Sequence, residues 1–490
     1  MRQIILPPTH RAQHASVSSP ARQARPMRPD LVAKYRNQRV PRYTSYPPSP
    51  QFSAAVTAGD YRRWLGQLTA ADTLSLYLHV PFCRSMCWYC GCHTTVVTHE
   101  APIRRYQAAL EAEIDAVAGA LVPDSTLSRG GGLPPVTHIH FGGGTPTLLP
   151  PDAFLSLMDR LARRFGRPAA TAEIAVEIDP RTLTPAMAAA LGQGGVTRAS
   201  LGVQSFDDRV QRAINRVQPY AATAEAVARL RQSGIGGINL DLIYGLPHQT
   251  VDSCVQSVTQ ALQLAPDRLS VFGYAHMPSL KAHQGRIEAA ALPGAAERTE
   301  QAAAMAAALE AAGYVAIGLD HYARADDVMA LAYNAGRLKR NFQGYTVDTA
   351  TALLGFGASA IGRTRGGYIQ NQVAVPAYLK AWEDGGEGWA VAKGLALSDD
   401  DRLRADIIEQ LMCCFSVDLE ETCRRHGRPL AEILTPATER ALAALSSDDM
   451  IICDKTRVEV REEARPLVRS VAVLFDAYFD PGSGRHSYAV

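Results

Sequence analysis

The chain has 490 residues, which is too long for one ordinary domain and enough for two or three. Its 47% hydrophobic and 20% charged residues exclude a disordered or collagen-like chain. The formal net charge of +2 provides no global field for nucleic acid or an anionic membrane, and no apolar stretch approaches the ~18 residues that a membrane span needs.

The amino terminus is basic and rich in proline. Residues 1–29 contain five arginines and no Asp or Glu, which is the composition of an organelle transit peptide. The segment also carries five prolines and lacks a clear amphipathic helical pattern. We therefore interpret residues 1–30 as a disordered basic leader on a cytoplasmic protein, without a secretory signal. Residues 31–72 are expected to form an N-terminal extension that closes over the site.

From about residue 73 onward, short β-rich runs alternate with helical patterns. Strands are expected at residues 75–80, 137–141, 173–178, 198–203, 238–243 and 268–274. Helices are expected between them, for example at residues 106–121, 153–165, 221–232 and 251–264. This alternation requires right-handed crossovers and a parallel sheet. Polar residues at the strand ends would then gather at the carboxyl rim, where such folds place their chemistry: Glu177, Asp179, Gln204, Asp241 and Tyr274.

After Pro278 the pattern changes. We expect a helix over residues 295–312, a loop-rich region from 320 to about 367, and mostly helical structure from about 399 with a small hairpin wing at 450–460. The predicted fold is α/β: a partial (β/α)6 TIM-like barrel with an N-terminal extension and a mostly helical C-terminal domain. The predicted boundaries are 73–368 for the barrel with its substrate-site extension and 369–490 for the C-terminal domain.

Four of the nine cysteines lie within ten residues: Cys83, Cys87, Cys90 and Cys92. The others are scattered, so a secreted disulfide framework is not indicated and a reducing compartment fits. Three thiolates at spacings of four and three can hold a cuboidal iron–sulfur cluster with one iron open. Tetrahedral zinc needs a fourth ligand, which Cys92 could supply, but structural zinc sites usually pair two separated hooks. The pattern favours the cluster.

A glycine run, Gly142-Gly143-Gly144-Thr145-Pro146-Thr147, follows the second expected strand. Glycines let a backbone approach a ligand closely and expose its N–H and C=O groups, although a glycine run alone is usually just a turn. The C-x3-C-x2-C spacing, with an aromatic residue before the last cysteine, resembles the signature of the radical S-adenosylmethionine (SAM) superfamily. The glycine run, one strand later, matches the superfamily's site for the amino and carboxylate groups of SAM.

Further motifs resemble one family within this superfamily. They are Arg42-Tyr-Thr-Ser-Tyr-Pro47, Tyr77-Leu-His-Val-Pro-Phe-Cys83, Cys90-Gly-Cys92, Gly202-Val-Gln-Ser-Phe206, Asp241-Leu-Ile-Tyr-Gly-Leu-Pro247, Tyr274-Ala-His-Met-Pro278, Asp320-His-Tyr-Ala-Arg324 and Arg340-Asn-Phe-Gln-Gly-Tyr-Thr346. Together they look like the oxygen-independent coproporphyrinogen III oxidases of haem biosynthesis, from about residue 31 almost to the carboxyl end. The haem-chaperone branch of the family typically lacks the Cys-Gly-Cys and carries an His-Asn-containing motif in place of the Arg340 stretch.

The resemblance implies a set of cofactor-binding residues. Cys83, Cys87 and Cys90 would ligate a 4Fe–4S cluster whose open iron takes one SAM, and a second SAM would bind beside the first. Contacts to the first SAM are implied for Tyr77, Gly143, Glu177 and Ile361. Contacts to the second are implied for Tyr89, Gly144, Thr145, Gln204, Arg216, Asp241 and Ala275. Tyr89 is a departure, since members usually carry Phe there. Cys92 is implied near the cluster, as a candidate catalytic residue for hydrogen or electron handling.

The implied reaction is the anaerobic oxidative decarboxylation of two propionates of coproporphyrinogen III to vinyl groups. It gives protoporphyrinogen IX through a 5′-deoxyadenosyl radical from SAM, and it needs an electron donor and an electron acceptor that the sequence does not identify. We expect a monomer without nucleic-acid or membrane partners. Candidate cationic anchors for the substrate are Arg216, Arg324, Lys339 and Arg340. Two alternatives stay open: a haem-chaperone-type member without decarboxylase activity, and a zinc-stabilised noncatalytic binding protein.

Overall fold

The computed structural model describes residues 29–35, 38–121, 132–383 and 389–480. Residues 1–28 of the expected leader lie outside the described residues, and helix α1 already begins at its end (Pro29–Tyr35). In the described ranges, no helix is both long enough and apolar enough to cross a membrane.

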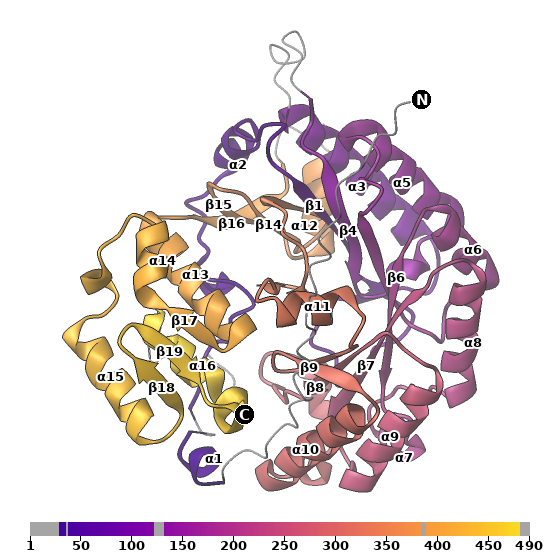
Figure 1. Ribbon diagram of the computed structural model, residues 1–490. Coiled ribbons are helices and arrows are strands. Elements are labelled where there is room, and N and C mark those ends of the chain that lie inside the picture. The colour runs from indigo at the N-terminus through magenta and orange to yellow at the C-terminus, as the bar shows by residue number, and fades with distance from the viewer. Residues whose placement is uncertain (1–28, 36–37, 122–131, 384–388, 481–490) are drawn as a thin grey trace, which may run out of the picture.

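One twelve-stranded sheet forms the barrel, in the order β16-β15-β14-β13-β1-β4-β5-β6-β7-β8-β10-β9 (Figure 1). The six expected strands pair in parallel in chain order: β1 (Leu74–Val80), β4 (Val136–Gly143), β5 (Glu173–Ile178), β6 (Arg198–Gln204), β7 (Gly237–Tyr244) and β8 (Arg268–Gly273). The crossover helices cover the outer face of the sheet: α3 (Ala101–Leu121), α5 (Pro151–Phe165), α6 (Pro185–Gln193), α8 (Tyr220–Gln232), α9 (Val251–Gln263) and α10 (Ala295–Ala311). The partial (β/α)6 barrel is confirmed.

The alternation of side chains along β1 decides which residues reach the inside of the barrel. Leu74, Leu76 and Leu78 are fully buried in the core that β1 shares with the outer helices. Tyr77 and His79 alternate with these leucines and therefore point to the opposite face of the sheet. Strand β1 thus contributes its leucines to the core beneath the outer helices and Tyr77 and His79 to the barrel interior.

The region from residue 320 to about 367 is not loop-rich, as the sequence pattern suggested. It contains helix α11 (Val328–Asn334) and five short strands: β10 (His321–Arg324), β11 (Lys339–Asn341), β12 (Gly344–Thr346), β13 (Ala352–Phe356) and β14 (Ile361–Arg363). Strand β13 pairs in parallel with β1 and extends the sheet on that side. These strands have three to five residues each, which is too short for a readable hydrophobic period.

The sheet also continues past residue 368. Strand β15 (Gly367–Asn371) spans the boundary drawn there, and after helix α12 (Val375–Glu383) strand β16 (Val391–Ala396) still belongs to the sheet. The barrel extension therefore ends close to the start of α13 (Asp399–Cys414). The expected boundary fell inside a strand because a five-residue antiparallel strand such as β15 carries no local signal of the sheet that it joins.

The remaining part combines helices with a small sheet. Its helices are α13, α14 (Leu419–Arg425), α15 (Pro436–Ser447) and α16 (Val468–Ala472). Strands β18 (Ile451–Asp454) and β19 (Arg457–Val460) form the expected hairpin, and β17 (Ser416–Asp418) adds a third strand to β19. The helical character and the hairpin are confirmed, and the third strand was missed.

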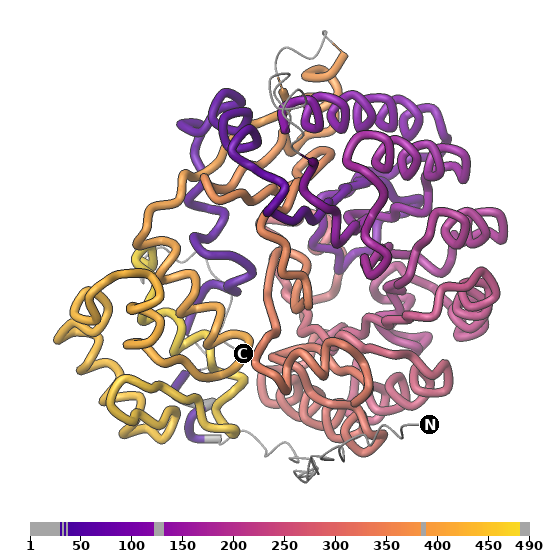
Figure 2. Tube along the Cα trace, turned by 45° about the horizontal axis from the view of Figure 1, so that its top comes forward, coloured from indigo at the N-terminus to yellow at the C-terminus, as the bar shows by residue number. Residues whose placement is uncertain are grey.

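The N-terminal extension packs on this helical part before it reaches the barrel. Leu31, Tyr35, Val40, Tyr43 and Tyr46 belong to the same hydrophobic core as α13 and α16. Figure 2 shows the indigo segment running beside the C-terminal part on its way to α2 (Ala58–Leu65), which packs against α3. The extension thus connects the two halves of the molecule.

A buried carboxylate joins α3 to the sheet extension. Glu113 of α3 is 3% exposed and accepts hydrogen bonds from three donors: Tyr378 Oη (2.6 Å), Asn371 Nδ2 (2.6 Å) and Gly357 N (2.7 Å). Burial raises the pKa of Glu113 to about 7, although the three hydrogen bonds act to lower it. The network ties α12, β15 and the end of β13 to one helix.

We expect Glu113→Gln to lower the free energy of unfolding by about 2–4 kcal/mol, because the amide N–H2 would face groups that themselves donate. The control is Glu383→Gln, which removes an exposed ion pair with Arg105 that joins the same two helices. Urea unfolding followed by circular dichroism measures both, and the control should keep its midpoint. Equal midpoints for the two variants would contradict a structural role of the network.

Candidate functional site

A cavity of about 200 Å³ opens at the carboxyl ends of the parallel strands. The cysteine loop after β1, the glycine run after β4 and polar residues at the ends of β5, β6 and β7 line it. The structure thereby brings together most residues implied by the sequence: Cys83, Cys87, Cys90, Cys92, Tyr89, Gly143, Gly144, Thr145, Glu177, Gln204, Arg216 and Asp241.

Tyr77, Ile361 and Ala275 are not part of the cavity wall. The Tyr77 ring stacks on His140 with a centroid distance of 5.8 Å, and it lies directly behind the glycine run. Ile361 begins β14 and packs its backbone against Gly355, the residue that pairs with Tyr77 across β1 and β13. Ala275 follows the end of β8. These three residues lie at the edge of the site.

Donors surround the sulfur atoms of the cysteine loop. Thr94 Oγ1 donates to Cys83 Sγ at 3.2 Å, and Thr145 Oγ1 lies 3.5 Å from the same sulfur. Burial raises the pKa of the Cys83 thiol despite these contacts. The Cys92 backbone N–H donates to Cys90 Sγ at 3.4 Å, and a side-chain hydrogen bond from Cys92 lowers the pKa of Cys90 to about 6. Such donors favour the thiolate, which is the form that binds metal.

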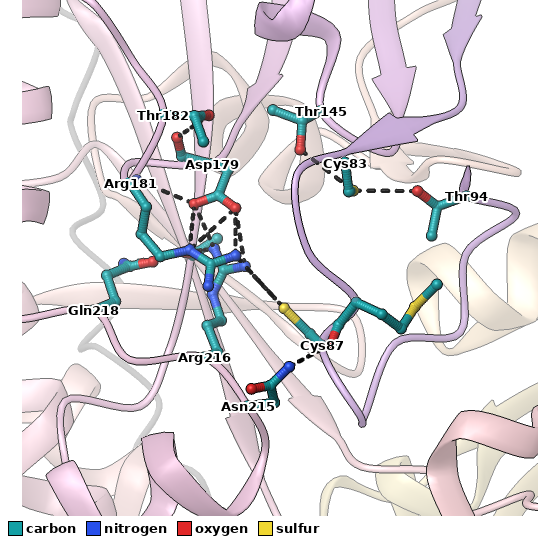
Figure 3. A network of polar contacts seen from close by, with 12 residues as sticks. Cys83, Cys87, Thr94, Thr145, Asp179, Arg181, Thr182, Asn215, Arg216 and Gln218 are labelled. Atoms are coloured by element: carbon teal, nitrogen blue, oxygen red, sulfur yellow. Dashed lines mark hydrogen bonds and ion pairs between the residues drawn. The ribbon is translucent and has the colours of Figure 1, made fainter. Parts of the chain in front are cut away.

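Two arginines reach the third sulfur (Figure 3). Arg181 Nη2 lies 3.6 Å and Arg216 Nη1 3.5 Å from Cys87 Sγ. Both guanidinium groups also bind the Asp179 carboxylate, at 2.6 Å and 3.4 Å, and Arg216 Nη2 donates to Gly202 O at 2.7 Å. Arg181 was not among the residues expected from the sequence, although its place just after a strand-end aspartate was a usable signal.

The spacing of the ligand groups separates zinc from a cluster. Four thiolates on one zinc ion, with Zn–S near 2.3 Å, bring their sulfurs to about 3.8 Å from each other. In the part of the chain that the structure describes, no three His, Cys, Asp or Glu side chains gather closely enough to hold one metal ion. Cys83, Cys87 and Cys90 nevertheless line one cavity, as thiolates on different irons of a cuboidal cluster must. The three thiols that share the cavity fit such a cluster.

The glycine run passes too close to its neighbours for any side chain. Gly143 has φ +118°, and a Cβ there would lie 2.7 Å from His79 Cε1. A Cβ on Gly144 would lie 2.6 Å from the carbonyl oxygen of Phe82. The backbone N–H of Gly144 donates to Val80 O at 2.9 Å. Only glycine fits both positions, and its backbone at the cavity is open to a ligand.

Two carboxylates at the cavity differ in their partners. Glu177 accepts from Gly143 N at 3.0 Å and lies 3.3 Å from His140 Nε2. Burial acts to raise the pKa of Glu177, but these contacts lower it below its usual value. Asp241 accepts from Asn239 Nδ2 at 2.8 Å, and burial raises its pKa. Both groups can accept hydrogen bonds from ribose hydroxyls or an amine.

The segment after β8 holds the cysteine loop from outside. Gln284 Nε2 donates to Tyr89 O at 3.0 Å, and His283 Nε2 lies 2.7 Å from Cys90 O. These contacts fix the loop backbone without using the thiols.

Two family models match the chain: the Radical SAM superfamily at residues 77–261 and the HemN C-terminal domain at residues 397–467. The chain is 54% identical to the oxygen-independent coproporphyrinogen III oxidase of Bradyrhizobium diazoefficiens over 464 residues, which cover 95% of this chain and 100% of that protein. Identity to the Paracoccus denitrificans protein of the same name is 42%, covering 92% and 97%. The chain belongs to the oxygen-independent coproporphyrinogen III oxidase family.

The fold agrees with this family. The solved coproporphyrinogen III oxidase (HemN) of Escherichia coli, described as a radical SAM enzyme, superimposes with a TM-score of 0.85 at 34% identity, covering 93% of this chain and 100% of that one. The resemblance seen in the motifs is therefore confirmed, and the haem-chaperone alternative is not favoured. This chain matches the Radical SAM superfamily, and enzymes of that superfamily use a 4Fe–4S cluster and SAM.

We expect Gly144→Ala to weaken SAM binding by about tenfold or more, because the new Cβ would overlap a backbone carbonyl of the cysteine loop. The matched control is Gly285→Ala, whose Cβ meets nothing within 4 Å. Equilibrium dialysis of labelled SAM against reconstituted protein measures both. Unchanged affinity in the Gly144 variant would place the SAM site elsewhere.

Proposed function

We propose that this chain catalyses the oxygen-independent oxidative decarboxylation of two propionates of coproporphyrinogen III, giving protoporphyrinogen IX. Relatives that are 54% and 42% identical over nearly their whole length are named for this activity. The observation that carries the proposal is that Cys83, Cys87 and Cys90 share one cavity with the glycine run.

The chemistry explains why such a site is needed. The β C–H of a propionate is not acidic, so removal of a proton by a base cannot start the reaction. When bound, the cluster and SAM supply a 5′-deoxyadenosyl radical that removes this hydrogen atom. Loss of carbon dioxide and one electron then leaves the vinyl group, and the electron passes to an acceptor. The protein's own residues position the propionate and exclude water.

We assign Cys83, Cys87 and Cys90 as the three cluster ligands, with the fourth iron open to SAM. The hydroxyl of Thr94 and the guanidinium groups of Arg181 and Arg216 support this assignment, since they aim hydrogen bonds at two of the sulfurs. Hydrogen bonds and positive charge near a thiolate stabilise its negative charge and tune the metal that it binds.

The proposal includes two SAM molecules. Glu177 in β5 and Asp241 in β7 face the same cavity from strands that are separated by β6. At the usual strand spacing their backbones stand about 10 Å apart, so each can serve a separate ligand. Gly143 and Glu177, with Tyr77 and Ile361 behind them, would hold the first SAM. The second would contact Tyr89, Gly144, Thr145, Gln204, Arg216 and Asp241 of the cavity wall, with Ala275 outside the wall.

We expect the wild-type protein to bind two SAM per chain and Asp241→Asn to bind one at the same SAM concentration, because the amide cannot replace the carboxylate as an acceptor from two hydroxyls. The control is Asp208→Asn, whose side chain is 76% exposed in α7 (Asp208–Ala213). Titration with labelled SAM, normalised to iron content, measures the stoichiometry. One SAM per wild-type chain would contradict the second site.

Cys92 is proposed to handle hydrogen or electrons beside the cluster. We expect Cys92→Ser to keep its iron and sulfide but to lower decarboxylation about 100-fold, as removal of a hydrogen-transfer group does. Cys90→Ser should lose the cluster. Iron analysis and anaerobic turnover with coproporphyrinogen III, SAM and a reductant measure both. Loss of iron from the Cys92 variant would make Cys92 a ligand, and full activity would leave it without a role.

The same turnover assay tests the whole function. Carbon dioxide and a divinyl product are expected, and their absence from protein with an intact cluster would favour a haem-chaperone role. We further propose a cytoplasmic monomer that receives electrons from an external donor. All nine cysteines are free thiols, which supports a reducing compartment.

A further inference from the structure

Four arginines from separate parts of the chain form a cluster near the carboxyl ends of β7 and β8. Arg42 lies in the N-terminal extension, Arg298 in α10, Arg340 in β11 and Arg469 in α16. We call this set the arginine cluster. Its members span more than four hundred residues of sequence, so no local pattern reveals it.

The charges of the cluster act on one another. Burial, together with the positive charges of Arg42 and Arg340, lowers the pKa of Arg469 to about 10. Burial also lowers the pKa of Arg42, with Arg340 and Arg298 acting in the same direction. The carboxylate that Arg42, Arg340 and Arg469 share is Asp320, which opposes these effects. Positive charge therefore exceeds negative charge within this set.

Contacts with aromatic rings position two of the arginines, Arg298 and Arg340. The Arg298 guanidinium lies 6.0 Å from the centroid of the Tyr244 ring, and a Cβ on Gly273 would be 3.3 Å from its Nη2. Arg340 lies over the Tyr345 ring at 4.3 Å, and its Nε and Nη1 are buried without a hydrogen-bond partner. Buried N–H groups of a cation almost always have an acceptor, so this site calls for an anion.

Asp320 is held in place for the cluster. Its Oδ1 lies 2.6 Å from His321 Nδ1, and the His321 ring meets Phe272 and Tyr345 edge-on at 5.8 Å and 5.5 Å. The Asp-His pair of the motif at residues 320–324 thus has a structural purpose: it fixes one carboxylate among several guanidinium groups.

A cavity of about 360 Å³ meets the cluster at Arg340, whereas Arg42, Arg298 and Arg469 are not among the residues that line it. Arg340 lines it, as do Tyr43 to Tyr46, which directly follow Arg42, and residues of α13 close the opposite side. Both places border β7: Asp241 lines the cavity at the cysteine loop, and Tyr244, at the end of the strand, has its ring centroid 6.0 Å from the Arg298 guanidinium. One macrocycle with carboxylates around its rim can reach both places.

We propose that the arginine cluster binds the two propionate carboxylates that coproporphyrinogen III retains, while a reacting propionate lies at the cysteine loop. This inference rests on the proposed function. Guanidinium groups stabilise a carboxylate but not neutral carbon dioxide, so strong cationic anchors on a reacting carboxylate would oppose its loss. Retained carboxylates carry no such penalty.

The other candidate anchors have partners of their own. Arg324 is exposed and bound to Asp326, and it ends β10 at the amino-terminal side of β8, opposite to Asp320. Lys339 binds Glu409 at 2.8 Å. Arg324 therefore serves as a matched control.

Binding of stable oxidised porphyrins to the reconstituted holoenzyme tests the inference without turnover. Coproporphyrin III, its tetramethyl ester and protoporphyrin IX are titrated by absorbance or fluorescence quenching. We expect Arg42→Gln, Arg340→Gln and Arg469→Gln each to raise the Kd of coproporphyrin III about tenfold or more, since each removes a charge-assisted contact. Arg324→Gln should bind like the wild type, and wild-type protein should bind the ester at least about tenfold more weakly.

Protoporphyrin IX carries only the retained carboxylates, so its Kd should rise in the variants as much as that of coproporphyrin III. Protoporphyrin IX binding that is insensitive to the variants would show that the cluster holds the reacting carboxylates instead. Equal affinity of wild-type protein for coproporphyrin III and its ester would overturn the inference, and this arm needs no variant to fold. Arginine-dependent binding without decarboxylation would contradict only the proposed function.

Discussion

The close contact between the glycine run and the cysteine loop holds the site together. Gly144 N donates to Val80 O at 2.9 Å, and Thr145 N to Phe82 O at 2.7 Å. These bonds form only because residue 144 has no side chain. The loop that carries the thiols and the glycine backbone at the cavity are consequently one unit. Parallel pairing of β1 with β4 places that unit at the same rim as Glu177 and Asp241.

Positive charge is arranged around fixed carboxylates at two places. Beside the sulfurs, Asp179 holds Arg181 and Arg216, which direct hydrogen bonds to Cys87. Farther along the strand ends, Asp320 faces three members of the arginine cluster, Arg42, Arg340 and Arg469. A chain with a formal net charge of only +2 thus concentrates cations beside the thiols and at the arginine cluster.

The segments outside the barrel supply members of the arginine cluster. The N-terminal extension and α16 pack in one hydrophobic core and supply Arg42 and Arg469. The separate two-stranded sheet of β11 and β12 supplies Arg340, and the Glu113 network ties β15 and the end of β13 to α3.

The sequence by itself determined the six parallel strands, their crossovers, the clustered thiols and the glycine run. It could do so because the hydrophobic period, the cysteine spacing and the positions of glycines are local properties of the chain. It did not predict β10 to β14, whose three to five residues are too few to show a period, nor the strand that crosses residue 368. Arg181 and the arginine cluster emerged only from the tertiary structure. Their meaning depends on which charges meet in space, and the fold alone decides how residues hundreds of positions apart come together.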